Sequence, residues 1–208
     1  MIHAMMFSAQ GGAIGQNSWP NSGTYSFVVP DGVYFIAAIL IGGGGGGGTG
    51  SPGDSYSAGA GGGGARAYHN AIPVTPGETL TIIVGAGGSA GGTMQGGSAG
   101  SASQIKRGTV TLLSAGSGGG GRWDNGAGGA GGNASGGEVN QSGSAGEGGQ
   151  SIYAKGGSAG GMVGYLTGAN LYGGVGTMGV GGNGEKTSGL CNSGSGGGVR
   201  FMWGGGRS

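Results

Sequence analysis

An unbroken run of seven glycines, Gly42–Gly48, is the feature of this sequence that most restricts its fold. Such a run brings no side chain to a hydrophobic core, and 66 of the 208 residues are glycine, against about 7% in ordinary soluble proteins. Each glycine ordered in regular structure costs roughly 0.5–1 kcal/mol relative to alanine. An ordered chain of this composition must therefore be stabilised by backbone hydrogen bonds and close backbone packing.

Three classes of glycine-rich chain have to be compared. Collagen needs glycine at every third position with abundant proline, which the seven-residue run and the 5 prolines exclude. A flexible Gly/Ser linker is the second class. The third is a bundle of polyglycine II chains, which have three residues per turn and no internal hydrogen bonds, so that each N–H and C=O can pair with a neighbouring chain. Glycine is required where such chains touch, because a Cβ would hold them apart.

Conventional β-strands are predicted beside the first glycine tracts. Tyr25, Phe27 and Val29 occupy alternate positions, which is the period of a half-buried strand. Residues 33–41 are almost continuously apolar, which predicts a central buried strand. The turns Pro30-Asp31-Gly32 and Thr75-Pro76-Gly77-Glu78 each combine a proline with a glycine that accepts a positive φ. Further strands are expected over residues 65–74, 79–84, 103–105, 109–113 and 199–203.

No stretch has the 3.6-residue period of an amphipathic helix. The predicted fold class is all-β, a small antiparallel β-sandwich fused to a polyglycine II bundle, with essentially no α-helix. We expect an N-terminal arm over residues 1–22 and a sandwich scaffold over residues 23–113 plus 197–208. The polyglycine II lattice, with exposed loops, is expected over residues 114–196.

Residues that carry chemistry are few and scattered, so we predict that the chain is not an enzyme. His3 and His69 lie far apart, the seven acidic residues occur singly, and Cys191 is the one cysteine. No metal-ligand spacing is present, and neither a catalytic residue, a metal nor a cofactor is expected. The pattern Gly126-x-Gly128-x-x-Gly131 matches a dinucleotide fingerprint, but chance matches are frequent at this glycine content.

Macromolecular partners of two kinds are also not expected. The eight basic residues are dispersed and form no basic stripe, so no nucleic acid is predicted. The longest apolar run, residues 33–41, is far shorter than the ~20 residues of a membrane-spanning helix. Membrane insertion is therefore not predicted.

Large side chains interrupt the glycine tracts and are the candidates for recognition. They either cap the lattice or project from loop tips, where Tyr and Trp offer large contact areas with little entropy loss. Trp123, between Arg122 and Asp124, combines stacking with polar contacts suited to a sugar or a protein loop. The candidate binding residues are Tyr56, Arg122, Trp123, Asp124, Tyr153, Tyr165, Leu166, Leu171 and Tyr172. Met5, Met6 and Phe7 form an apolar cluster that either belongs to a plain arm or docks on a partner subunit.

Several segments resemble the glycine-rich domain of bacteriophage tail and fibre proteins. They are YSFVVPDGV at residues 25–33, ILIGGGG at 39–45, PVTPGETLTIIVGAGG at 73–88 and GGVRFMWG at 197–204. The glycine tracts are also similar to those of the tip adhesins of T-even-like phages, in which polyglycine II rods form a sandwich and the loops contact the receptor. The resemblance implies that this role falls on the inserts around Tyr56, Trp123, Tyr153, Tyr165 and Tyr172.

The resemblance implies a virion protein of a tail fibre or tail tip that binds a bacterial outer-membrane protein or surface glycan. Its partners would be other virion subunits, as in a trimeric fibre or a homotrimer, and it would be assembled in the host cytoplasm. The alternative is a structural fibre, collar or capsid-decoration protein without a receptor. An ice-binding protein is a third class, but its threonines lack the regular spacing that such a face requires.

Overall fold

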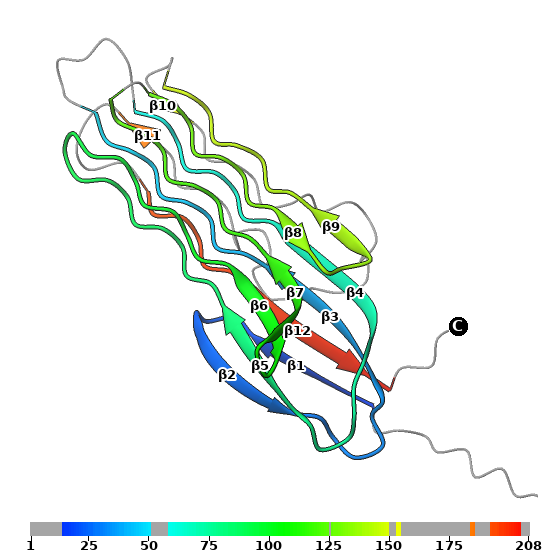
Figure 1. The fold of residues 1–208 in the computed structure, drawn as a ribbon. Helices are drawn as coiled ribbons and strands as arrows, with labels where there is room; N and C mark the ends of the chain where they lie inside the picture. Colours follow the sequence, from blue (N-terminus) through cyan, green and yellow to red (C-terminus); the bar gives the residue numbers. More distant parts are fainter. Residues whose placement is uncertain are drawn as a thin grey trace, which may run out of the picture.

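The computed structural model describes residues 14–50, 58–124, 126–149, 153–154, 184–185 and 192–204. These residues form an elongated body with a β-sandwich at one end and a bundle of extended glycine chains at the other (Figure 1). The described residues contain twelve β-strands and no helix. The prediction of an all-β protein is therefore confirmed for this part of the chain.

Two five-stranded antiparallel sheets make the sandwich, and a two-stranded sheet lies apart from them. Sheet A has the order β1 (Gly15–Trp19), β12 (Gly198–Trp203), β3 (Phe35–Ile41), β4 (Arg66–Pro73) and β9 (Val139–Gln141). Sheet B has the order β2 (Gly23–Val28), β5 (Thr79–Val84), β6 (Ser103–Arg107), β7 (Val110–Ala115) and β8 (Ala134–Ser135). The small sheet pairs β10 (Tyr153–Ala154) with β11 (Gly184–Glu185).

The strands expected from apolar patterning are all present. The predicted central strand at residues 33–41 is β3, which lies between β12 and β4 inside sheet A. The strands expected at residues 65–74, 79–84, 103–105, 109–113 and 199–203 are β4, β5, β6, β7 and β12.

Strand β1 lies in the region that the sequence assigned to an arm. Residues 15–19 lack apolar alternation, and only Trp19 of this strand is buried. Its conformation follows from pairing along its whole length with β12, from Gly15 opposite Trp203 to Trp19 opposite Val199. This pairing joins segments that are far apart in the chain, and the local sequence carries no sign of it.

Two proline–glycine turns carry the chain from one sheet to the other. The turn at residues 30–32 carries the chain from β2 in sheet B to β3 in sheet A, and the turn at residues 75–78 carries it from β4 back to β5. Gly32 and Gly77 have φ values of 77° and 80°. The predicted positive φ at both turn glycines is confirmed. Both turns lie at the end of the sandwich away from the rods (Figure 1).

The core lies between the sheets and is dominated by aromatic and branched side chains. Phe201 of β12 is fully buried, and its ring centroid lies 5.1 Å from those of both Trp19 and Phe27 in near-perpendicular contacts. Edge-to-face packing is a favourable arrangement for aromatic rings. Leu80, Ile82, Ile105 and Leu113 of sheet B belong to the same core cluster.

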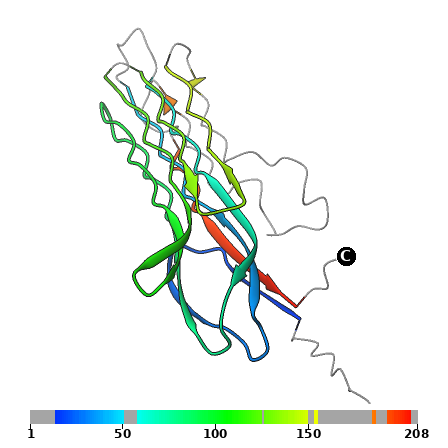
Figure 2. The ribbon, with the colours of Figure 1, turned by 45° about the vertical axis from the view of Figure 1, so that its right-hand side comes forward.

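Beyond the strands the chain continues as extended segments, here called rods, that run side by side away from the sandwich (Figure 2). Their hydrogen bonds repeat every third residue, as expected for chains with three residues per turn. The rods among the described residues are 42–50, 58–65, 85–91, 95–101, 116–122, 126–133, 143–149 and 192–197. Together they are called the glycine lattice.

Rod 42–50 shows how the lattice is built. Its successive N–H groups donate in turn to three different rods, 58–65, 95–101 and 192–197. The first set is Gly42 to Ala65, Gly45 to Gly62 and Gly48 to Gly59, each with an N···O distance of 2.9 Å. Rods 85–91 and 116–122 donate back to the carbonyls of rod 42–50. A rod surrounded in this way exchanges hydrogen bonds in several directions, which a β-strand cannot do.

Close backbone contact explains the glycine at the centre of the lattice. A Cβ on Gly45 would lie 1.9 Å from the carbonyl oxygen of Gly119, and a Cβ on Gly62 would lie 2.0 Å from that of Ala130. Towards the surface the same period allows side chains, because every third residue faces outward. In rod 126–133, Gly126, Gly129 and Gly132 are buried, whereas Ala130 and Asn133 are exposed.

The lattice and the sandwich are built from the same stretches of chain. Rods 42–50, 58–65, 85–91 and 95–101 come from the region that the sequence assigned to the sandwich scaffold, and they hydrogen-bond to rods from residues 116–149. The structure differs here from the expected sequential division. The physical reason is that β3, β5 and β7 continue directly into rods, and β4, β6 and β12 follow from rods, so one chain crossing serves both halves.

Candidate binding surface at the tip of the glycine lattice

The end of the lattice far from the sandwich, here called the tip, is where the described rods turn. Thr49 N–H donates to the Gln95 carbonyl at 2.9 Å, and Arg122 N–H donates to the Ala127 carbonyl at 2.8 Å. These contacts place the 92–94 and 123–125 connections at one end. Gly149 and Asn192 lie there too, bonded to Gly126 and Gly47. The chain therefore leaves and rejoins the lattice at the tip on either side of residues 150–191.

Trp123 is the large aromatic side chain that the structure describes at this end. It is 40% exposed and lies in the connection between rods 116–122 and 126–133. The rods on both sides are held by hydrogen bonds at every third residue, from Gly116–Asn133 to Arg122–Ala127. The backbone of the rods that flank Trp123 is therefore fixed by the lattice, and the side chain is partly open to solvent.

Arg122 and Asp124 flank Trp123 and bind each other through a two-point contact. Arg122 Nε donates to Asp124 Oδ1 at 3.1 Å, and Arg122 Nη2 donates to Asp124 Oδ2 at 2.9 Å. The hydrogen bond to Asp124 and its negative charge raise the pKa of Arg122. Both side chains are largely exposed, so the pair contributes little to stability. The contact joins the two residues that flank Trp123 in the sequence.

Met94 is a further tip residue that was not among the candidates predicted from the sequence. It is 49% exposed and has a φ of 56°, a left-handed conformation that is rare for side chains other than glycine, asparagine and aspartate. Thr49 is buried nearby in the same layer and donates from Oγ1 to the Gly91 carbonyl at 2.7 Å. A large apolar residue within the glycine tract 91–97 was the signal that could have identified Met94.

The remaining predicted binding residues are placed only in part. Tyr153 lies in β10, opposite Glu185 of β11. The predicted residues outside the described part of the chain are Tyr56, Tyr165, Leu166, Leu171, Tyr172, Met5, Met6 and Phe7. Of the nine binding candidates, the structure therefore brings together Arg122, Trp123 and Asp124, which are neighbours in sequence.

Two further contacts between oppositely charging side chains occur away from the tip in the described residues. Arg107 contacts Glu78 at 2.9 Å and also donates to the Pro73 carbonyl, which ties the β6–β7 hairpin to a sandwich turn. His69 lies 3.4 Å from Glu138. No group of three or more His, Cys, Asp or Glu side chains that could hold a metal occurs in the described ranges. No described helix is long and apolar enough to cross a membrane.

The fold and the tip define a class of protein, an all-β protein in which polyglycine rods extend a sandwich and carry short connections at their far end. The sequence profile of the glycine-rich domain matches residues 20–208. The chain belongs to this family of glycine-rich domains. No curated protein matches the sequence significantly.

Proposed function

We propose that this protein is a phage virion protein of a tail fibre or tail tip that binds a bacterial surface receptor through the tip of its glycine lattice. The observation that carries the proposal is that the two ends of the molecule differ. Both ends of the described chain, Ile14 and Gly204, lie at the sandwich end, whereas the described rod connections lie at the tip (Figure 1). A protein held by one end presents the other.

The composition of the tip supports recognition of a receptor. Trp123 and Met94 are large, half-exposed side chains at the end of rods made mostly of glycine, serine and alanine. Tryptophan and arginine are enriched among residues that dominate binding energies. The resemblance to phage tail and fibre proteins adds the host surface as the partner, either an outer-membrane protein or a glycan.

The test is binding of fluorescently labelled protein to intact bacteria from a panel of candidate hosts, with Trp123→Ala compared with wild type. We expect saturable binding that competes with phage adsorption, and a loss of about tenfold or more in affinity for Trp123→Ala. Tyr34→Ala is the matched control, because Tyr34 is an exposed aromatic residue at the sandwich end.

Two outcomes would contradict the proposal. Unchanged binding by the Trp123→Ala variant, together with loss in Tyr34→Ala, would place recognition at the sandwich end. If protein that is shown to be folded by its cooperative unfolding binds to none of the hosts, a structural fibre, collar or decoration protein is favoured instead.

A further inference from the structure

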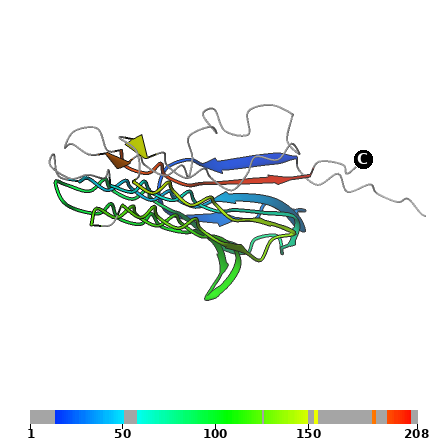
Figure 3. The ribbon, with the colours of Figure 1, turned by 90° about the horizontal axis from the view of Figure 1, so that it is seen from above.

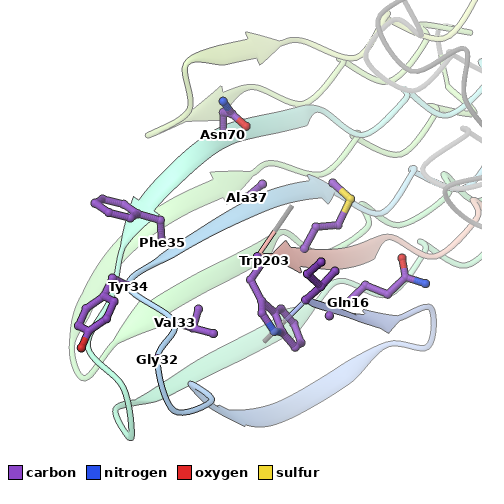
Figure 4. Close-up of a pocket in the computed structure, with 12 residues that line it drawn as sticks. Gln16, Gly32, Val33, Tyr34, Phe35, Ala37, Asn70 and Trp203 are labelled. Carbon is purple, nitrogen blue, oxygen red and sulfur yellow. The ribbon is translucent and has the colours of Figure 1, made fainter. Parts of the chain in front are cut away.

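A groove of about 690 Å³ lies at the sandwich end, on the side of the molecule away from the tip (Figure 4). Tyr34 and Phe35 lie on one side of it and Gln16 and Trp203 on the other, with Val33 between them. The lining residues are Ile14, Gly15, Gln16, Gly32, Val33, Tyr34, Phe35, Ala37, Asn70, Met202, Trp203 and Gly204.

The groove follows one row of residues across sheet A. Gln16 of β1 pairs with Met202 of β12, and Met202 pairs with Ala37 of β3. Ala38 pairs with His69 and Ile36 with Ile72, so Ala37 faces Asn70 and Ala71 of β4 across a β-bulge. Four strands spaced by about 4.8 Å make a floor roughly 14 Å wide.

The lining of the groove is uncharged and mostly apolar, with the amides of Gln16 and Asn70 as polar side chains in its floor. No lining residue carries a charge at neutral pH. Ile14 is 81% exposed and Tyr34 is 54% exposed, although both are large apolar or aromatic side chains. Farther along the same face of β3, Ile39 and Ile41 are only 5% and 6% exposed. The groove is therefore the part of this face that stays open to an apolar occupant.

The chain carries a segment that matches this surface next to it in sequence. Residues 1–7, MIHAMMF, contain no Asp, Glu, Lys or Arg and include five large apolar side chains, Met1, Ile2, Met5, Met6 and Phe7. Residues 8–13 connect this segment to Ile14, itself part of the groove wall. Six extended residues reach about 20 Å, and Gly11-Gly12 within them permit a reversal of direction.

We propose that the groove at the sandwich end is the docking site for this chain's own residues 1–7. In extended conformation, seven residues span about 23 Å, which covers the roughly 14 Å floor. The attachment is intramolecular, so the segment is present at high effective concentration. The inference does not depend on the receptor proposed for the tip.

The experiment is a proximity cross-link in the full chain. Ala4→Cys at the centre of the segment is combined with Ala37→Cys at the centre of the groove floor, in a Cys191→Ser background. The probe is a short bifunctional maleimide, and the readout is the intact mass and gel mobility of the product. The matched control is Ala4→Cys with Val110→Cys, because Val110 is 61% exposed on the β6–β7 hairpin, which projects away from the body (Figure 3).

Docking predicts intramolecular cross-linking at least about tenfold faster for the position 37 pair than for the control pair. Adding Met5→Ser, Met6→Ser and Phe7→Ser should lower the rate at position 37 to the control rate. Equal rates in the two pairs would overturn the proposal. Products linked between two molecules would also overturn it, because the occupant would then be the segment of a second copy.

Discussion

At the scale of single residues, the glycines of the lattice interior are the most constrained positions in the described chain. A methyl group added at Gly45 would lie 1.9 Å from the carbonyl oxygen of Gly119. The backbone of Gly119 cannot move aside, because hydrogen bonds hold the rods on several sides. We expect Gly45→Ala to lower the free energy of unfolding by about 3 kcal/mol. Denaturant unfolding of the purified variant measures this change.

Gly148 is the control for that substitution. A Cβ there would meet its nearest neighbour, the Gly126 carbonyl oxygen, at an ordinary 3.4 Å, and the residue is exposed. Gly148→Ala should be neutral or stabilise the protein by up to about 1 kcal/mol, because alanine reduces the entropy of the unfolded chain. Equal destabilisation by both substitutions would show that the backbone conformational preference of glycine, and not close contact, selects glycine in the lattice.

Ser103 is a buried polar residue at the seam between sandwich and lattice. Its Oγ accepts a hydrogen bond from Gly85 N–H at 3.0 Å and donates one to the Ile41 carbonyl at 2.7 Å. Ser103 therefore connects the start of rod 85–91, which follows β5 of sheet B, to the end of β3 in sheet A. Ser103→Ala removes both bonds in a fully buried position. We expect a loss of about 1–3 kcal/mol in unfolding free energy.

Calorimetry or denaturant unfolding tests this expectation against Ser101→Ala. Ser101 is two residues away and exposed, so the same chemical change there should alter stability by no more than about 0.5 kcal/mol. A Ser103→Ala variant as stable as wild type would mean that the seam does not depend on these hydrogen bonds.

At the scale of secondary-structure elements, β12 connects the latest part of the described chain to the earliest. It lies between β1 and β3 in sheet A and carries Phe201 into the aromatic cluster. Phe201→Ala should cost about 3–5 kcal/mol, because a fully buried ring is lost and the surrounding rings cannot fill the space. Urea or guanidinium unfolding gives the value.

Phe35→Ala is the comparison within the same sheet. Phe35 is 55% exposed at the start of β3, so its removal should cost less than about 1 kcal/mol. If the two phenylalanine substitutions had similar effects, β12 would not anchor the sandwich as its position in sheet A indicates.

Strand prediction succeeded where the sequence alternates or is continuously apolar and failed where pairing is imposed from outside. Residues 33–41 and 79–84 carry their own pattern and form β3 and β5. Strands β8 and β9 are two and three residues long and lie among glycine, serine and asparagine. They exist because β7 and β4 offer free edges beside them, and no local composition predicts that.

At the scale of the whole molecule, stability should depend little on ionic strength. The chain has a formal net charge of +1 with 7% charged residues, and the described ion pairs of Arg107 and Arg122 are partly or largely exposed. Exposed pairs contribute about 0–1 kcal/mol each. We expect the unfolding free energy in urea to change by less than about 1 kcal/mol between dilute buffer and 1 M sodium chloride. A large decrease at high salt would reveal an ionic contribution outside these pairs.

The sequence by itself determined the β-class of the fold, the long strands, the turn glycines and the need for close backbone packing, because each follows from local periodicity or from the missing Cβ. It also marked Trp123 with its charged neighbours as a candidate for recognition. Only the tertiary structure decided which rods touch, that β1 completes sheet A, and that tip and groove lie at opposite ends. Those features depend on hydrogen bonds between distant segments. Because the glycine-rich segments have similar local sequences, the sequence of one segment does not show which other segments it will contact.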